Sequence, residues 1–332
     1  MFSSDVNRHS KRMPAVLVLV IVAILVVADV CGAQTNSLSG PVVGYVFDRQ
    51  ASNVRPIQGI LGSATVGAPV ETDAAMISQS LALGATHAIV STDQALLALS
   101  LSGGKSSSLA IPSLPPNPTR MAASIQATAA AVYYSSTNEV RIVTGLPQEP
   151  RYAGTVHVDR PLTRMAVSDD GRVLVYATDE ADGNFLYAWT ASSGASRFVT
   201  SATSISGIAI TRNGDAIVTA EADNEVFAIF DASGGAVRRL LADVRQGVSR
   251  PIGVALSPDG RILVGNKESA TVTVLDSNGR LLRTLHCDCA VSGVYPIRDA
   301  VFLLTDGIDH TLYLLDAGSP EERILFVPPP QE

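Results

Sequence analysis

Short apolar runs alternate with tight polar turns along most of the chain. The stretch "GVALSPDGRILVGNKESATVTVLDSNGRLLRTL", from Gly253 to Leu285, contains four such runs, rich in β-branched residues. The turns between them contain Asp, Asn, Gly and Ser, and Asp-Gly and Asn-Gly pairs readily adopt the positive φ of tight hairpins. The pattern therefore predicts four consecutive antiparallel strands.

Weaker copies of this stretch lie upstream and downstream. The turns "SDDG", "TRNG" and "SPDG" end at Gly171, Gly214 and Gly260, which are 43 and 46 residues apart. A second marker, an Asp after the third run of a copy, recurs at intervals of 45 and 40 residues, at Asp231, Asp276 and Asp316. Four strands per unit at this period predict a β-propeller, in which neighbouring blades bury each other's faces.

The fold class expected from these repeats is all-β, with residues 34–332 forming a single propeller domain. Residues 34–73 hold two predicted strands and form a reduced first blade. Residues 74–332 hold six repeats of 40 to 46 residues, at 74–116, 117–157, 158–202, 203–247, 248–290 and 291–330. The total length favours seven blades, and a six-bladed ring with the first strands added at its closure is the alternative.

In one alanine-rich segment, helix propensity and the alignment of the repeats predict different structures. "TRMAASIQATAAAVYY", from Thr119, looks helical by composition. Its alignment with "TRMAVSDDGRVLVYAT", from Thr163, instead predicts a strand, a turn and a strand.

The N-terminus has the pattern of a secretory signal. Arg8, Lys11 and Arg12 precede an apolar run of 14 residues, and small residues follow near Ala33. Residues 1–33 are thus expected to be a cleaved signal peptide, which places the protein in the periplasm or outside the cell. A retained single-pass anchor, with the propeller still outside the cytoplasm, is the alternative and would be the protein's one contact with a membrane.

The repeat "RPIGVALSPDGRILVGNKESATVTVLDSNGRLLRTL" resembles the repeats of the YVTN and NHL propeller families of exported bacterial type, and more distantly those of WD-repeat proteins. The resemblance implies a ring around a central channel. Most such proteins are binding platforms and a minority are enzymes, so the resemblance favours an extracytoplasmic binding or scaffold module.

Composition narrows the possible functions. The formal charge of −7 argues against a nucleic-acid partner. Propeller sialidases and quinoprotein dehydrogenases use repeated tryptophan motifs, and this chain has one tryptophan, Trp189. No catalytic serine, phosphate-binding or zinc motif occurs, and no cofactor or metal is expected. A channel-centred hydrolase or lyase of lactonase-like type remains the alternative function.

The repeat register predicts which residues face the channel. Seven residues before the turn glycines lie Arg164, Gly207 and Gly253, and the same register gives Arg120 and Gly293. We expect glycine at these positions to keep the mouth wide. Arg120 and Arg164, with Arg250 just outside, would either be neutralised by neighbouring acids or hold the carboxylate or phosphate of a small anionic ligand.

The loops between second and third strands are acidic. A propeller gathers these loops on one face, so an acidic rim is expected that attracts a basic protein partner or cations, unless the loops are ordinary solvated turns. The residues expected in this rim are Asp179, Asp182, Glu221, Asp223, Glu268, Asp306 and Asp309.

Two cysteines remain after signal cleavage. Cys287 and Cys289 lie two residues apart, and an extended backbone would hold their α-carbons near the limit for bridging. A local turn would allow a disulfide. A reduced pair and a metal site that includes His286 are the alternatives.

Export generates the first testable prediction. We expect cleavage after Ala33, so N-terminal sequencing of the secreted protein should read Gln-Thr-Asn-Ser. Cleavage removes three basic and two acidic residues, which changes the formal charge from −7 to −8. A full-length chain recovered in the membrane fraction would instead identify an uncleaved anchor.

Overall fold

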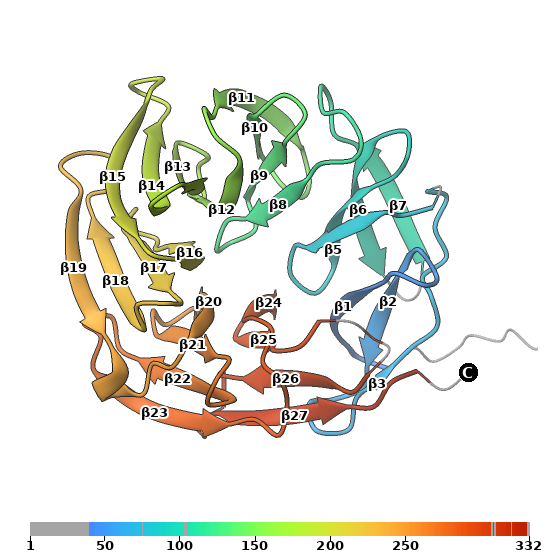
Figure 1. The fold of residues 1–332 in the computed structure, drawn as a ribbon. Helices are drawn as coiled ribbons and strands as arrows, with labels where there is room; N and C mark the ends of the chain where they lie inside the picture. The colour runs from blue at the N-terminus through green and yellow to red at the C-terminus, as the bar shows by residue number, and fades with distance from the viewer. Residues whose placement is uncertain are drawn as a thin grey trace, which may run out of the picture. The chain divides into compact units, whose positions relative to one another are not determined.

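The computed structural model describes residues 40–330, except residues 75, 103, 104, 307, 309 and 320. The expected signal peptide lies outside the described residues. The described chain folds into seven antiparallel sheets arranged as blades around a centre (Figure 1). Six blades have four strands, and the first has three. The predicted all-β propeller with seven blades is therefore confirmed.

Each blade is a continuous stretch of chain whose strands pair in sequence order. The strands of the first four blades are β1 (Val42–Asp48), β2 (Asn53–Gln58) and β3 (Thr65–Val66); β4 (Gln79–Ala82), β5 (His87–Ser91), β6 (Leu96–Ser102) and β7 (Lys105–Ala110); β8 (Arg120–Ala123), β9 (Ala129–Tyr134), β10 (Glu139–Thr144) and β11 (Arg151–His157); and β12 (Leu162–Val167), β13 (Val173–Glu180), β14 (Gly183–Thr190) and β15 (Ser196–Ala202).

The strands of the last three blades are β16 (Ile205–Ile210), β17 (Ala216–Ala220), β18 (Glu225–Phe230) and β19 (Val237–Ala242); β20 (Pro251–Leu256), β21 (Ile262–Asn266), β22 (Thr271–Leu275) and β23 (Leu281–His286); and β24 (Tyr295–Arg298), β25 (Val301–Leu303), β26 (Leu312–Asp316) and β27 (Arg323–Val327). One 3-10 helix, η1 (Val244–Gln246), follows β19. The alanine-rich segment forms β8 and β9, as its alignment predicts.

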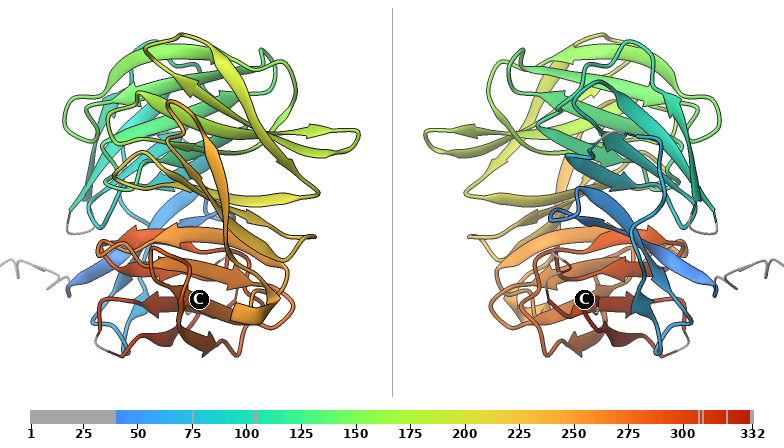
Figure 2. Two further views of the ribbon diagram at one scale, coloured as in Figure 1. Left: turned by 90° about the vertical axis from the view of Figure 1, so that its left-hand side faces the viewer. Right: turned by 90° about the vertical axis from the view of Figure 1, so that its right-hand side faces the viewer.

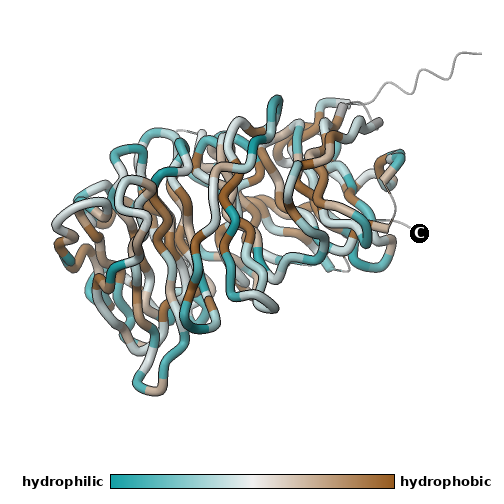
Figure 3. Tube along the Cα trace, turned by 90° about the horizontal axis from the view of Figure 1, so that it is seen from above, coloured by the Kyte–Doolittle hydropathy of each residue, from teal (hydrophilic) through white to brown (hydrophobic). Residues whose placement is uncertain are grey.

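The core lies between the blades. Seven clusters of buried apolar side chains fill the structure, one between each pair of neighbouring blades. Tyr133 and Trp189 belong to the cluster between the third and fourth blades, and Phe227 to the next. Figure 3 shows apolar strands inside and polar turns at the surface. Each blade thus buries both of its faces against its neighbours.

The turn between the first and second strands explains the repeated sequence motif. In three blades the glycine N–H donates to the carbonyl of the Ser or Thr three residues earlier, at 2.9–3.0 Å. These glycines, Gly171, Gly214 and Gly260, have φ of +70°, +85° and +86°. Only glycine adopts that conformation without strain, so the spacing of the motif reports the spacing of the blades.

The recurrent Asp has a similar role at the end of the third strand. Its carboxylate accepts main-chain N–H groups of the following turn, from Gly235 to Asp231 at 2.7 Å and from Asn278 to Asp276 at 2.9 Å. A side chain that caps a turn in this way favours the hairpin to the fourth strand.

The ring closes where the first blade meets the seventh. Val43 and Val46 of β1 pack in one apolar cluster with Ile297 of β24 and Leu312 of β26. The Arg298 Nη1 also donates to the Val42 carbonyl at 3.0 Å. Among the described strands, none of the first blade joins the sheet of the seventh, so side-chain packing carries the closure.

The strands of each blade run across the thickness of the ring, so the turns gather on its two faces (Figure 2). The start of each first strand pairs with the end of the second strand, as Leu162 does with Thr178. The loops between second and third strands therefore lie on the same face as the connections between blades. We call this the upper face. No helix of the described chain is long and apolar enough to cross a membrane.

The closure contact leads to a stability prediction. A Cβ added at Gly44 of β1 would overlap the Ile297 Cγ2. Gly44→Ala should therefore lower the free energy of unfolding by about 1–3 kcal/mol. Gly154→Ala is the matched control, because a Cβ there meets no atom within 4 Å.

Chemical denaturation of the Gly44→Ala, Ile297→Ala and double variants would test this. Removing Cγ2 also removes the overlap, so the double variant should lose at least about 0.5 kcal/mol less than the sum of the single losses. Strictly additive losses would show that the two positions do not meet.

Candidate ligand site at the channel mouth

The three predicted arginines lie on the upper face. Arg120 begins β8, Arg164 is the third residue of β12, and Arg250 precedes β20. The first strands lie innermost in the ring, and β12, β16 and β20 contact one another in succession (Figure 1). Arg120 and Arg164 therefore stand in neighbouring blades at the mouth of the central channel.

Arg164 is held by main-chain groups of two blades. Its Nε donates to the Ser206 carbonyl of the next blade, and its Nη1 donates to the Thr163 carbonyl, both at 2.8 Å. The side chain is half-buried. Carbonyl oxygens fix the guanidinium without neutralising it, so its charge remains available to a ligand.

Three charged or ionisable groups, Arg120, Tyr295 and Glu221, act on the pKa of this guanidinium. Burial lowers the pKa of Arg164 below its usual value, and the charge of Arg120 lowers it further. Tyr295 and Glu221 act on the Arg164 pKa in the opposite direction. Among the residues that the structure describes, neither Arg120 nor Arg164 forms an ion pair. Two like charges thus share the mouth without a carboxylate against either one.

Arg250 has a different environment. Its Nη2 lies 2.8 Å from the Glu221 Oε1, and its main-chain N–H donates to the Asn224 Oδ1 at 2.6 Å. These contacts hold the residue at a φ of +47°. Because Arg250 already has an acidic partner, the candidate anion site narrows to Arg120 and Arg164.

Of the predicted acidic residues, Asp179 lies near the end of β13, and Asp182, Glu221, Asp223, Glu268 and Asp306 lie in loops of the upper face. Several of them accept hydrogen bonds from neighbouring residues. Asp223 accepts bonds from the Thr203 N–H at 3.0 Å and from its hydroxyl at 2.7 Å. Asn184 donates to Asp179 at 3.2 Å, and Ser249 donates to Glu268 at 3.5 Å. The remaining members of the set are Asp182 and Asp306, which are exposed, and Asp309, which lies outside the described residues.

The glycines of the inner strands do not widen the mouth as expected. A Cβ on Gly207 would lie 2.9 Å from the Val254 nitrogen and 3.0 Å from the Gly253 Cα. A Cβ on Gly253 would lie 3.4 Å from the Gly293 Cα. The missing side chains thus let β16, β20 and the segment before β24 approach closely, which corrects the prediction.

Tyr295 is a channel residue that sequence reasoning missed. Its hydroxyl donates to the Ser292 carbonyl at 3.1 Å, and its ring covers Gly293. Desolvation, followed by the charge of Asp306, raises the Tyr295 pKa. The available signal was its position two residues after Gly293, since in an extended segment such residues share one face.

The cysteine pair forms a local disulfide. The chain bends after β23, and the α-carbons of Cys287 and Cys289 lie 5.0 Å apart. This bond occupies both thiols and leaves no thiolate for the alternative metal site with His286. Among the described residues, no three His, Cys, Asp or Glu side chains are grouped so that they could hold a metal ion.

Comparisons with known proteins identify the fold. No protein-family model and no curated protein matches the chain. Streptogramin B lyase is similar, with a TM-score of 0.54 and 10% identity over 77% of this chain and 84% of that chain. The hydrazine synthase of Kuenenia stuttgartiensis has a TM-score of 0.50 and 14% identity over 90% of this chain and 99% of that chain. At such identities the likeness shows the fold alone. The chain is a seven-bladed β-propeller with structural neighbours of propeller type.

Proposed function

We propose that the protein is an exported binding module that holds the anionic group of a small ligand between Arg120 and Arg164. The observation that carries this proposal is the arrangement of Arg164, which main-chain carbonyls fix beside a second arginine. Among the described residues, no hydrogen bond uses its Nη2. A carboxylate or phosphate accepts paired N–H groups from such a guanidinium and relieves the repulsion between the two arginines.

The fold supports the binding role, because propellers serve binding and scaffold proteins in general. A lyase that works in the channel is the alternative function. One structural neighbour, streptogramin B lyase, is named as a lyase, but its similarity to this chain is one of fold.

The proposal includes membership of the YVTN or NHL type of repeat. The identical turn hydrogen bonds at Ser168 and Ser257 support it, because both serines accept the N–H of the glycine three residues later at 2.9 Å. Secretion by a cleaved signal peptide, and a basic protein partner at the acidic loops of the upper face, belong to the same proposal and rest on the sequence alone.

A thermal-shift screen with acetate, citrate, phosphate and sulfate would test the anion site. An anion at one hundred times its dissociation constant stabilises the folded protein by about 2.7 kcal/mol, which corresponds to a rise in Tm of about 4 °C. We expect at least one anion to raise the Tm of the wild type. The Arg120→Ala, Arg164→Ala double variant should lose this response.

A matched control removes the same charge elsewhere. Arg212 and Arg280 are exposed and lie in turns between first and second strands and between third and fourth strands, on the opposite face. The Arg212→Ala, Arg280→Ala variant should respond like the wild type. A wild type that responds to no anion, or a site variant that responds as strongly as the control, would show that the arginines are structural.

A further inference from the structure

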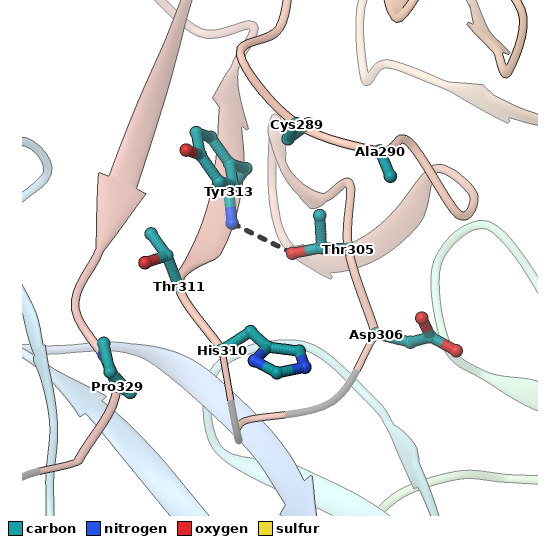
Figure 4. A pocket seen from close by; sticks show the side chains of 8 residues that line it. All are labelled: Cys289, Ala290, Thr305, Asp306, His310, Thr311, Tyr313 and Pro329. Atoms are coloured by element: carbon teal, nitrogen blue, oxygen red, sulfur yellow. Dashed lines mark hydrogen bonds between the residues drawn. The ribbon is translucent and has the colours of Figure 1, made fainter.

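A cavity of about 580 Å³ opens on the upper face between the sixth and seventh blades. Cys289 lines it from the connection between the blades, and Thr305, Asp306 and His310 line it from the loop between β25 and β26. Figure 4 shows Cys289, Thr305 and His310 on three sides of this space. The Tyr313 N–H donates to the Thr305 Oγ1 at 3.1 Å and fixes one wall. The cavity is therefore large enough for a small molecule, and one half of the disulfide borders it.

The two cysteines differ in how far they are exposed. Cys287 is 6% exposed and packs in the apolar cluster between the sixth and seventh blades, with Val291 and Phe302. Cys289 is half-buried and borders the cavity. An incoming nucleophile thus meets Cys289, and the sulfur that would leave belongs to the buried Cys287.

The disulfide also contributes little to the stability of the fold. It spans one intervening residue, Asp288, so it restricts the unfolded chain far less than a cross-link that closes a long loop. Both cysteines belong to one connecting segment, so the bond joins no two blades. Accessible disulfides that are not structural staples are those that exchange with thiols.

We propose that the Cys287–Cys289 disulfide is an exchange site that oxidises small thiols entering the cavity. This inference is independent of the anion site at the channel mouth. It concerns a separate group of residues, and neither Arg120 nor Arg164 takes part in it.

The reaction proceeds in two displacements. The incoming thiol loses its proton to water, and its thiolate attacks the Cys289 sulfur, which forms a mixed disulfide and releases the Cys287 thiolate. A second small thiolate then attacks the sulfur of the first and releases the Cys289 thiolate, and both protein thiolates take up protons from water. In total, two thiols become one disulfide, and the protein disulfide takes up the two electrons and becomes a dithiol.

Reduced glutathione is a suitable probe. The full chain would carry Cys31→Ser in every variant, so that Cys287 and Cys289 are its only cysteines. The oxidised protein would be incubated with millimolar glutathione, alkylated and weighed by mass spectrometry, while near-ultraviolet circular dichroism reports the fold. We expect two alkyl groups per chain at a temperature where the protein stays folded. A disulfide that resists glutathione until the protein unfolds would overturn the proposal.

Two single-cysteine variants test the direction of attack. Cys287→Ser leaves Cys289 at the cavity, and Cys289→Ser leaves Cys287 in the core. With oxidised glutathione, the first variant should form its mixed disulfide at least about tenfold faster than the second, because thiol reactivity follows access. Equal rates would show that the cavity does not direct exchange to Cys289 and would contradict the assignment. Unchanged anion responses in both variants would keep this result separate from the proposed ligand site.

Discussion

Apolar packing between the faces of neighbouring sheets is the interaction on which the rest of this molecule depends. A four-stranded blade is too thin to bury its own apolar side chains, so each blade is stable only between two others. The seven clusters, which hold side chains as large as Tyr133, Phe227 and Phe302, show that this demand is met at every interface of the ring. The inner strands are held in place by this packing, and the position of every channel residue follows from it.

The fold could be predicted because its turns use local chemistry. In several blades the hairpins use a glycine with positive φ after Ser or Thr, or an Asp that accepts main-chain N–H groups, whatever their neighbours are. These residues, such as Gly260 and Asp276, therefore mark the repeat in the sequence. The alanines of β9 have no such turn residue beside them, and their strand conformation could be predicted only from the register of the repeat.

The candidate site could be predicted only in part, because its details depend on neighbouring blades. The register placed Arg120 and Arg164 at one mouth. It could not show that Arg250 would pair with Glu221, or that carbonyls of two blades would hold Arg164. The register also predicted that Gly207 widens the channel mouth. In the structure the absence of its side chain instead makes room for the neighbouring strand, which a single blade's sequence does not show. Tyr295 was not predicted because the register selected one channel-facing position per blade, and in the seventh blade that position is Gly293.

The continuity of each blade has a consequence for how such a ring changes over time. Every described blade is one uninterrupted segment, and the ring closes through side chains such as Val43 and Ile297 without a shared strand. Duplication or loss of one gene segment would then add or remove a whole blade without re-pairing any strand. The remaining interfaces would need only to adjust their angles, and the channel would widen or narrow by one inner strand. In a ring closed by side-chain packing, recombination can therefore change the size of the channel. In a ring closed by a strand shared between its first and last blades, the N-terminal and C-terminal segments would have to change together.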